Sequence, residues 1–117
     1  MSARILLFCL LITVLLITGS TGAQQPTKIP RIGFLGTASP SIISARIEAF
    51  RQGLRELGYV EGKNIVVEYR YAEAKADRER ELAVELARLK VDVIVTAGPT
   101  VTRAAKEATV TIPIVFA

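Results

Sequence analysis

Residues 31–58 read RIGFLGTASPSIISARIEAFRQGLRELG, and this stretch predicts one complete strand, loop and helix. The first six residues, 31–36, are mostly apolar, as expected of a central strand in a parallel sheet. A helix is predicted from the loop to about residue 57, because apolar residues recur there at spacings of 4, 3, 4 and 3. Ser39 or Ser41 is expected to cap its N-terminus, and Gly58 to end it in a left-handed conformation. The apolar positions are Ile43, Ile47, Phe50, Leu54 and Leu57.

The same order of elements repeats along the chain. A second strand is predicted over 65–71, followed by a helix from its N-cap Asp77 to about Leu89. A third strand, 92–97, is closed by residues 98–100, which open a short alanine-rich helix through Ala108. With the final strand the order is βαβαβαβ, which implies right-handed crossovers. We therefore predict an α/β fold, a doubly wound, mostly parallel flavodoxin-like lobe with strand order 2-1-3-4.

The final strand, residues 112–117, is followed by no helix in this sequence. Parallel sheets are normally covered by helices on both faces, so the predicted lobe is incomplete. Val115 and Phe116 are expected to lie on an exposed edge strand. These features suggest the N-terminal part of a longer protein.

The predicted topology also indicates where a ligand would bind. In doubly wound sheets, ligands bind beyond the carboxyl ends of the strands, near the switch point between the first and third strands. Loop hydroxyls and backbone N–H groups at a helix start favour a carboxylate or another anion, so Thr37 or Ser39 is expected to hold a carboxylate or another polar end of the solute. The alternative is that these residues only cap helices or allow turns, and Arg70, Tyr71 and Glu73 are expected to form a solvated edge. The candidate ligand-binding residues are Thr37, Ala38, Ser39, Gly98, Pro99 and Thr100.

The N-terminus has the features of a signal peptide over residues 1–23. Arg4 provides the positive charge, an uncharged apolar run follows, and small residues precede a cleavage site at Ala23. The apolar run is shorter than the roughly 20 residues of a spanning helix, although an uncleaved anchor is the alternative. Residues 24–30 are then a short tail, and we expect a periplasmic or secreted protein.

Composition narrows the possible functions. The chain has no histidine and one cysteine, Cys9, so histidine-based catalysis, histidine-ligated zinc and a disulfide in the mature part are excluded. The net charge of +4 is spread over mixed-sign segments such as residues 77–81, whereas nucleic-acid-binding proteins concentrate lysine and arginine on one face. We expect a non-enzymatic protein with no metal or cofactor and no nucleic-acid partner.

Residues 50–65, FRQGLRELGYVEGKNI, resemble the signature stretch of a family of bacterial ABC-transporter substrate-binding proteins. Residues 67–73, 89–96 and 112–116 follow at family-like spacing. The resemblance implies a type I periplasmic-binding-protein fold, in which two flavodoxin-like lobes close on a small solute and present it to an ABC permease. Residues 31–117 would form part of the N-terminal lobe.

The function implied by this resemblance is capture of a small solute, such as an amino acid, for an ABC importer. Because ligand is held between two lobes, the chain alone is expected not to bind it tightly. Two alternatives stay open at this point: a periplasmic sensor or interaction domain, and a flavodoxin-like module that binds a flavin.

Overall fold

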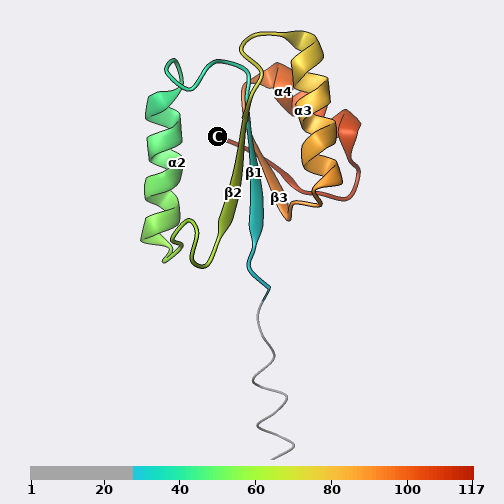
Figure 1. The fold of residues 1–117 in the computed structure, drawn as a ribbon. Coiled ribbons are helices and arrows are strands. Elements are labelled where there is room, and N and C mark those ends of the chain that lie inside the picture. The colour runs from blue at the N-terminus through green and yellow to red at the C-terminus, as the bar shows by residue number, and fades with distance from the viewer. Residues whose placement is uncertain (1–27) are drawn as a thin grey trace, which may run out of the picture.

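The computed structural model describes residues 28–117, so the predicted signal peptide and its cleavage site lie outside the described residues. Strands and helices alternate throughout this part of the chain (Figure 1). The elements are β1 (Arg31–Gly36), α2 (Ser44–Glu56), β2 (Val66–Tyr71), α3 (Ala76–Arg88), β3 (Val93–Ala97), α4 (Pro99–Ala108) and β4 (Ile114–Phe116).

The strands form one parallel sheet in the order β2-β1-β3-β4. Strand β1 is central and pairs with β2 along one side and β3 along the other, with Phe34 opposite Tyr69 and Val95. This confirms the predicted doubly wound topology and strand order. The connection leaving β1 therefore diverges from the one leaving β3, and the switch point between them lies at the top of the sheet in Figure 1.

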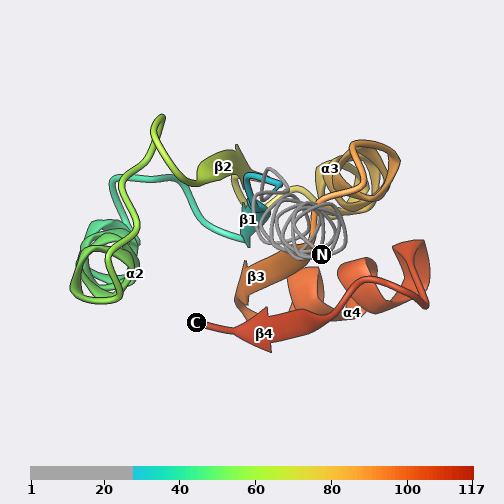
Figure 2. The same ribbon diagram turned by 90° about the horizontal axis from the view of Figure 1, so that it is seen from below.

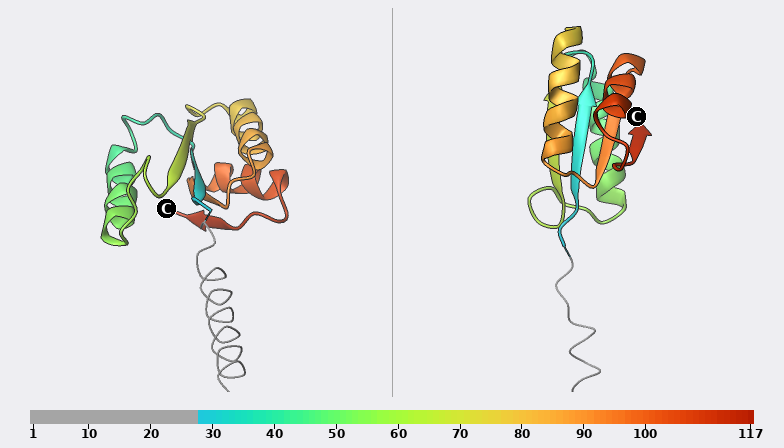
Figure 3. Two further views of the ribbon diagram at one scale, coloured as in Figure 1. Left: turned by 60° about the horizontal axis from the view of Figure 1, so that its bottom comes forward. Right: turned by 90° about the vertical axis from the view of Figure 1, so that its right-hand side faces the viewer.

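The two faces of the sheet are covered differently. Helix α2 lies alone on one face, and α3 and α4 lie together on the other (Figures 2 and 3). The α2 face is partly aromatic, with Phe34 at its centre and its ring centroid 5.2 Å from that of Phe50. The α3–α4 face is aliphatic, and Leu86 packs so closely on β1 that a Cβ at Gly33 would lie 2.9 Å from it. Its buried members include Leu35, Leu82, Leu86, Ile94 and Val101.

The predicted helix caps are wrong, although the helices themselves are confirmed. Helix α2 begins at Ser44, because the backbone N–H groups of Ile42 and Ile43 first close a turn on the carbonyl of Ser39. Helix α3 begins one residue before Asp77, and neither helix has a side-chain cap. The predicted left-handed Gly58 is confirmed, with a φ of 87°.

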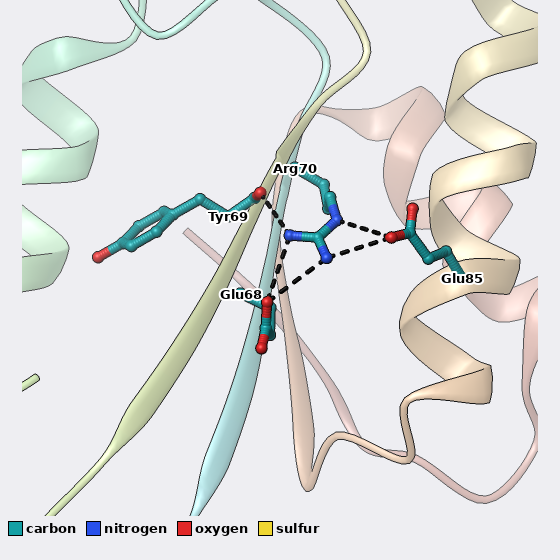
Figure 4. A network of polar contacts seen from close by, with 4 residues as sticks. All are labelled: Glu68, Tyr69, Arg70 and Glu85. Atoms are coloured by element: carbon teal, nitrogen blue, oxygen red, sulfur yellow. Dashed lines mark hydrogen bonds and ion pairs between the residues drawn. The ribbon is translucent and has the colours of Figure 1, made fainter. Parts of the chain in front are cut away.

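Arg70 on β2 is not the solvated edge residue that the sequence suggested. Its side chain is 24% exposed and its guanidinium bridges Glu68 on the same strand and Glu85 on α3, at 3.4 and 3.2 Å (Figure 4). It also donates to the carbonyl of Tyr69 at 2.9 Å. The guanidinium therefore ties α3 to the sheet edge, while Tyr71 is half-buried against the aromatic α2 face.

Strand β4 forms the opposite edge of the sheet in residues 28–117. Val115 is 51% exposed and Phe116 is 68% exposed, as expected for an edge strand. None of the helices between residues 28 and 117 is both long enough and apolar enough to cross a membrane.

Candidate functional site

Three loops meet at Thr37, directly after β1. Its backbone N–H donates to the carbonyl of Ala97, the last residue of β3, at 3.2 Å. Its own carbonyl accepts from the N–H of Ala74, in the loop after β2, at 2.7 Å. The carboxyl ends of β1, β2 and β3 are thus joined through one residue at the predicted switch point.

Gly98 connects β3 to α4 with a backbone conformation that other residues rarely adopt. Its φ is 125° and its ψ is 152°. A Cβ at this position would lie 2.4 Å from Oγ1 of Thr37, closer than non-bonded atoms can approach. Glycine therefore allows the turn and also leaves room for the Thr37 hydroxyl, while Pro99 is the first residue of α4, where its missing N–H costs nothing.

The hydroxyls of Thr37 and Thr100 form what we call the outer pair. Their oxygen atoms are 3.4 Å apart, and Thr37 is half-buried while Thr100 is exposed. Thr100 Oγ1 makes a second contact, in which it donates to Oε1 of Glu79 in the first turn of α3 at 2.9 Å. The side chains therefore run from the mouth of the site inward to a carboxylate.

Glu79 is the residue of this cluster that the sequence analysis missed. It is only 7% exposed, although the mixed-sign segment around it suggested a solvated helix face. Its burial could have been predicted from its position in the helix. Glu79, Leu82 and Leu86 are separated by 3 and 4 residues, so the glutamate lies on the inward face of α3. A charged residue at an inward position is rarely buried without a polar partner.

Thr96 and Thr102 form a second, inner pair beneath the first. Their oxygens are 2.7 Å apart, and the side chains are 0% and 4% exposed. Thr102 Oγ1 donates to the carbonyl of Gly98 at 2.8 Å, so the inner pair holds the Gly98 peptide in position. The inner pair was not predicted, because Thr96 reads as an ordinary strand residue.

Ser39 and Ala38 lie on the same loop as Thr37 but outside the hydroxyl cluster. The Ser39 hydroxyl is 3.2 Å from that of Ser41. Because α2 starts at Ser44, Ser39 is not at a helix N-terminus, contrary to the sequence-based argument for anion binding there. Of the candidate residues, the structure brings together Thr37, Gly98 and Thr100, with Pro99 between the last two.

Two depressions lie on opposite faces of the sheet, and the first includes residues of the outer pair's network. One, of about 320 Å³, runs between α3 and α4 and is lined by Glu79, Thr100 and Arg103 among others. The other, of about 330 Å³, is apolar and lies between Phe50 on α2 and Phe116 on β4. Within residues 28–117, no three His, Cys, Asp or Glu side chains gather as a metal site.

A separate polar network lies on the α2 face. The Tyr69 hydroxyl donates to Glu61 and accepts from Nε of Arg51 at 3.2 Å. The Arg51 guanidinium also lies 5.0 Å from the centre of the Tyr69 ring. Burial, followed by the hydrogen bond to Glu61, raises the pKa of Tyr69 to about 12. This network fastens the loop after α2 to the sheet, away from the switch point.

Comparison with known proteins identifies one matching family model. The model, described as ABC transporter substrate binding protein, matches residues 37–117. No curated protein sequence matches the chain.

Three solved structures share the fold. A substrate-binding protein with adhesive properties from Clostridium difficile, in its ligand-free, open structure, is 25% identical with a TM-score of 0.71. A conserved domain protein from Vibrio cholerae is 28% identical with a TM-score of 0.72. An ABC domain in complex with L-Trp from Streptococcus pneumoniae is 18% identical with a TM-score of 0.71, and shows the fold alone. The matches cover 75%, 76% and 76% of this chain, but 30% of each solved chain.

Proposed function

The chain belongs to the ABC transporter substrate-binding protein family, and from this premise we propose that it contributes to capture of a small solute for an ABC importer. The complete protein would be exported, would bind its solute without chemical conversion, and would deliver it to a permease in the membrane. No cofactor and no nucleic acid takes part in this function.

The observation that carries the proposal is the convergence of polar groups at the switch point. Thr37 lies in the loop after β1, whereas Gly98 and Thr100 lie at the start of α4, and these residues meet at the carboxyl edge of the sheet. Doubly wound folds bind their ligands at this place. The inner pair and the Gly98 turn hold the cluster on a rigid support, which favours binding with little reorganisation.

Backbone donors lie on the two segments that carry the cluster. In the part of the chain that the structure describes, the N–H groups of Ala38, Ser39 and Gly98 donate no hydrogen bond. Free N–H groups beside a hydroxyl can hold the carboxylate of a solute, because such bonds to a charged acceptor are strong. We therefore propose an amino acid as the solute class, with Ala38, Ser39 and Gly98 as the donors to its carboxylate.

A thermal-shift screen tests this proposal. The complete product of the gene is screened against the common amino acids, with sugars and inorganic anions as comparison solutes. We expect at least one amino acid to raise the melting temperature, and isothermal titration to give a defined stoichiometry. A screen in which only a sugar or an inorganic anion stabilises the protein would contradict the amino-acid assignment, and one with no stabilising solute would contradict the binding function.

A further inference from the structure

The contacts of Glu79 fix the direction of the hydrogen bonds at the mouth of the site. An ionised carboxylate can only accept hydrogen bonds, so the contact at 2.9 Å uses the hydrogen of the Thr100 hydroxyl. A hydroxyl has one hydrogen. In the outer pair, Thr100 is then left as the acceptor and Thr37 becomes the donor, across 3.4 Å.

The hydrogen of the Thr37 hydroxyl then points inward, toward Thr100. Its oxygen can still accept hydrogen bonds from the solvent side. We propose that Glu79 is a positioning residue that makes Thr37 a hydrogen-bond acceptor, so that Thr37 binds the ammonium or other N–H end of the solute. This inference rests on the proposed function and assigns Thr37 to an N–H end of the solute, where the sequence left open a carboxylate or another polar end.

The surroundings of Glu79 fit this role. Glu79 is 93% buried, and in residues 28–117 no ion pair joins it to an arginine. Arg80 pairs instead with Asp77 at 2.6 Å. The negative charge of Glu79 therefore acts on the site through Thr100, and a carboxylate placed against Thr37 would meet a lone pair with that charge behind it.

The outer pair and the backbone donors are then complementary. The N–H groups of Ala38, Ser39 and Gly98 offer donors, and Thr37 offers an acceptor on the same loop system. A solute that carries both an amino and a carboxylate group satisfies both kinds of partner. A solute with only a carboxylate leaves Thr37 unpaired, which costs affinity.

The first test does not depend on a solute. Neutron diffraction from deuterium-exchanged crystals of the complete gene product shows hydroxyl deuterons directly. We expect the Thr100 deuteron to point at Glu79 and the Thr37 deuteron to point at Thr100. A Thr37 deuteron directed away from Thr100, or a deuteron on the Glu79 carboxyl, overturns the inference while leaving the proposed function intact.

The second test uses three indole probes in isothermal titration: L-tryptophan, tryptamine, which lacks the carboxylate, and indole-3-propionate, which lacks the amine. The ratio of the affinities for tryptamine and indole-3-propionate defines the preference of the site, and both probes should bind more weakly than L-tryptophan because each leaves one kind of partner unpaired. In Glu79→Gln the amide can donate to Thr100 and free the Thr37 hydrogen, so this preference should fall about tenfold. Glu81→Gln, on the exposed side of the same helix, is the matched control and should keep the preference.

An unchanged preference in folded Glu79→Gln overturns the inference. If none of the three probes binds, the neutron map decides the inference and the amino-acid screen decides the proposed function. The two failures are therefore distinguishable.

Discussion

The outer and the inner hydroxyl pair each consist of two threonine side chains, but the two pairs lie in different surroundings. The inner oxygens are 2.7 Å apart and both threonines are buried, whereas the outer oxygens are 3.4 Å apart at the surface. Each pair ends on a strong acceptor, the Gly98 carbonyl for the inner pair and the Glu79 carboxylate for the outer pair. The hydrogen-bond direction is thus set in both.

The difference between the pairs lies in what each can exchange with solvent or ligand. A buried hydroxyl that loses its partner keeps the full cost of desolvation, so the inner pair contributes to the stability of the fold. An exposed hydroxyl can replace a weak contact by water or by a solute at little cost. We therefore expect mutations at the inner pair to change unfolding and mutations at the outer pair to change binding.

The largest effect is expected at Gly98, which contacts both pairs. Gly98→Ala places a Cβ 2.4 Å from Thr37 Oγ1 and forces alanine to a φ of 125°. We expect the free energy of unfolding to fall by about 3 kcal/mol, measured by urea denaturation.

Gly58→Ala is the matched control, because its φ is 87° but a Cβ there meets nothing within 4 Å. It should cost only about 1–2 kcal/mol, the price of the left-handed backbone alone. Adding Thr37→Ala to Gly98→Ala should recover part of the loss by removing the clash. Equal losses at both glycines and no recovery would mean that the Thr37 contact is unimportant.

The next effect separates the inner pair from the outer pair. Thr102→Val keeps the shape of the side chain but leaves the Thr96 hydroxyl buried without its acceptor. We expect a loss of about 1–3 kcal/mol in the free energy of unfolding, measured by urea denaturation.

Thr96→Val combined with Thr102→Val should cost less than Thr102→Val alone, since no buried hydroxyl is then left unpaired. A double variant that loses the sum of two independent penalties would show that the two hydroxyls do not act as a pair.

The sequence predicts the framework of this site better than its chemistry. The strand order follows from the alternation of strands and helices and the handedness of parallel crossovers, and it places Thr37 and Gly98 at the switch point. The pairing of Thr100 with Glu79 depends on how α4 packs against α3, a tertiary contact that local patterns do not contain. The helix caps were wrong for a similar reason, because a turn around Ser39 displaces the start of α2.

A smaller effect on stability is expected at the outer pair. Thr37→Val should change the free energy of unfolding by no more than about 0.5 kcal/mol, because its hydroxyl contact is long and near the surface. The affinity for tryptamine should nevertheless fall by about tenfold, because the acceptor for the amine is gone. Thr37→Ser retains the hydroxyl and should restore most of the affinity in the same titration. If valine weakens folding as much as Thr102→Val does, the distinction between the pairs is wrong.

Tyr69 provides a second hydroxyl that donates to a carboxylate, on the other face of the sheet, and its effect on stability is confined to alkaline pH. Burial and the Glu61 contact raise its pKa to about 12, whereas an unfolded tyrosine titrates near pH 10. The folded state therefore keeps this proton after the unfolded state has lost it. The resulting stabilisation is complete below about pH 10 and is lost as the pH rises toward 12.

Urea denaturation between pH 8 and roughly 11 should show a shallower fall in unfolding free energy for Tyr69→Phe than for the unmodified protein. Identical slopes would mean that burial and the contact with Glu61 do not raise the pKa of this hydroxyl in the folded protein.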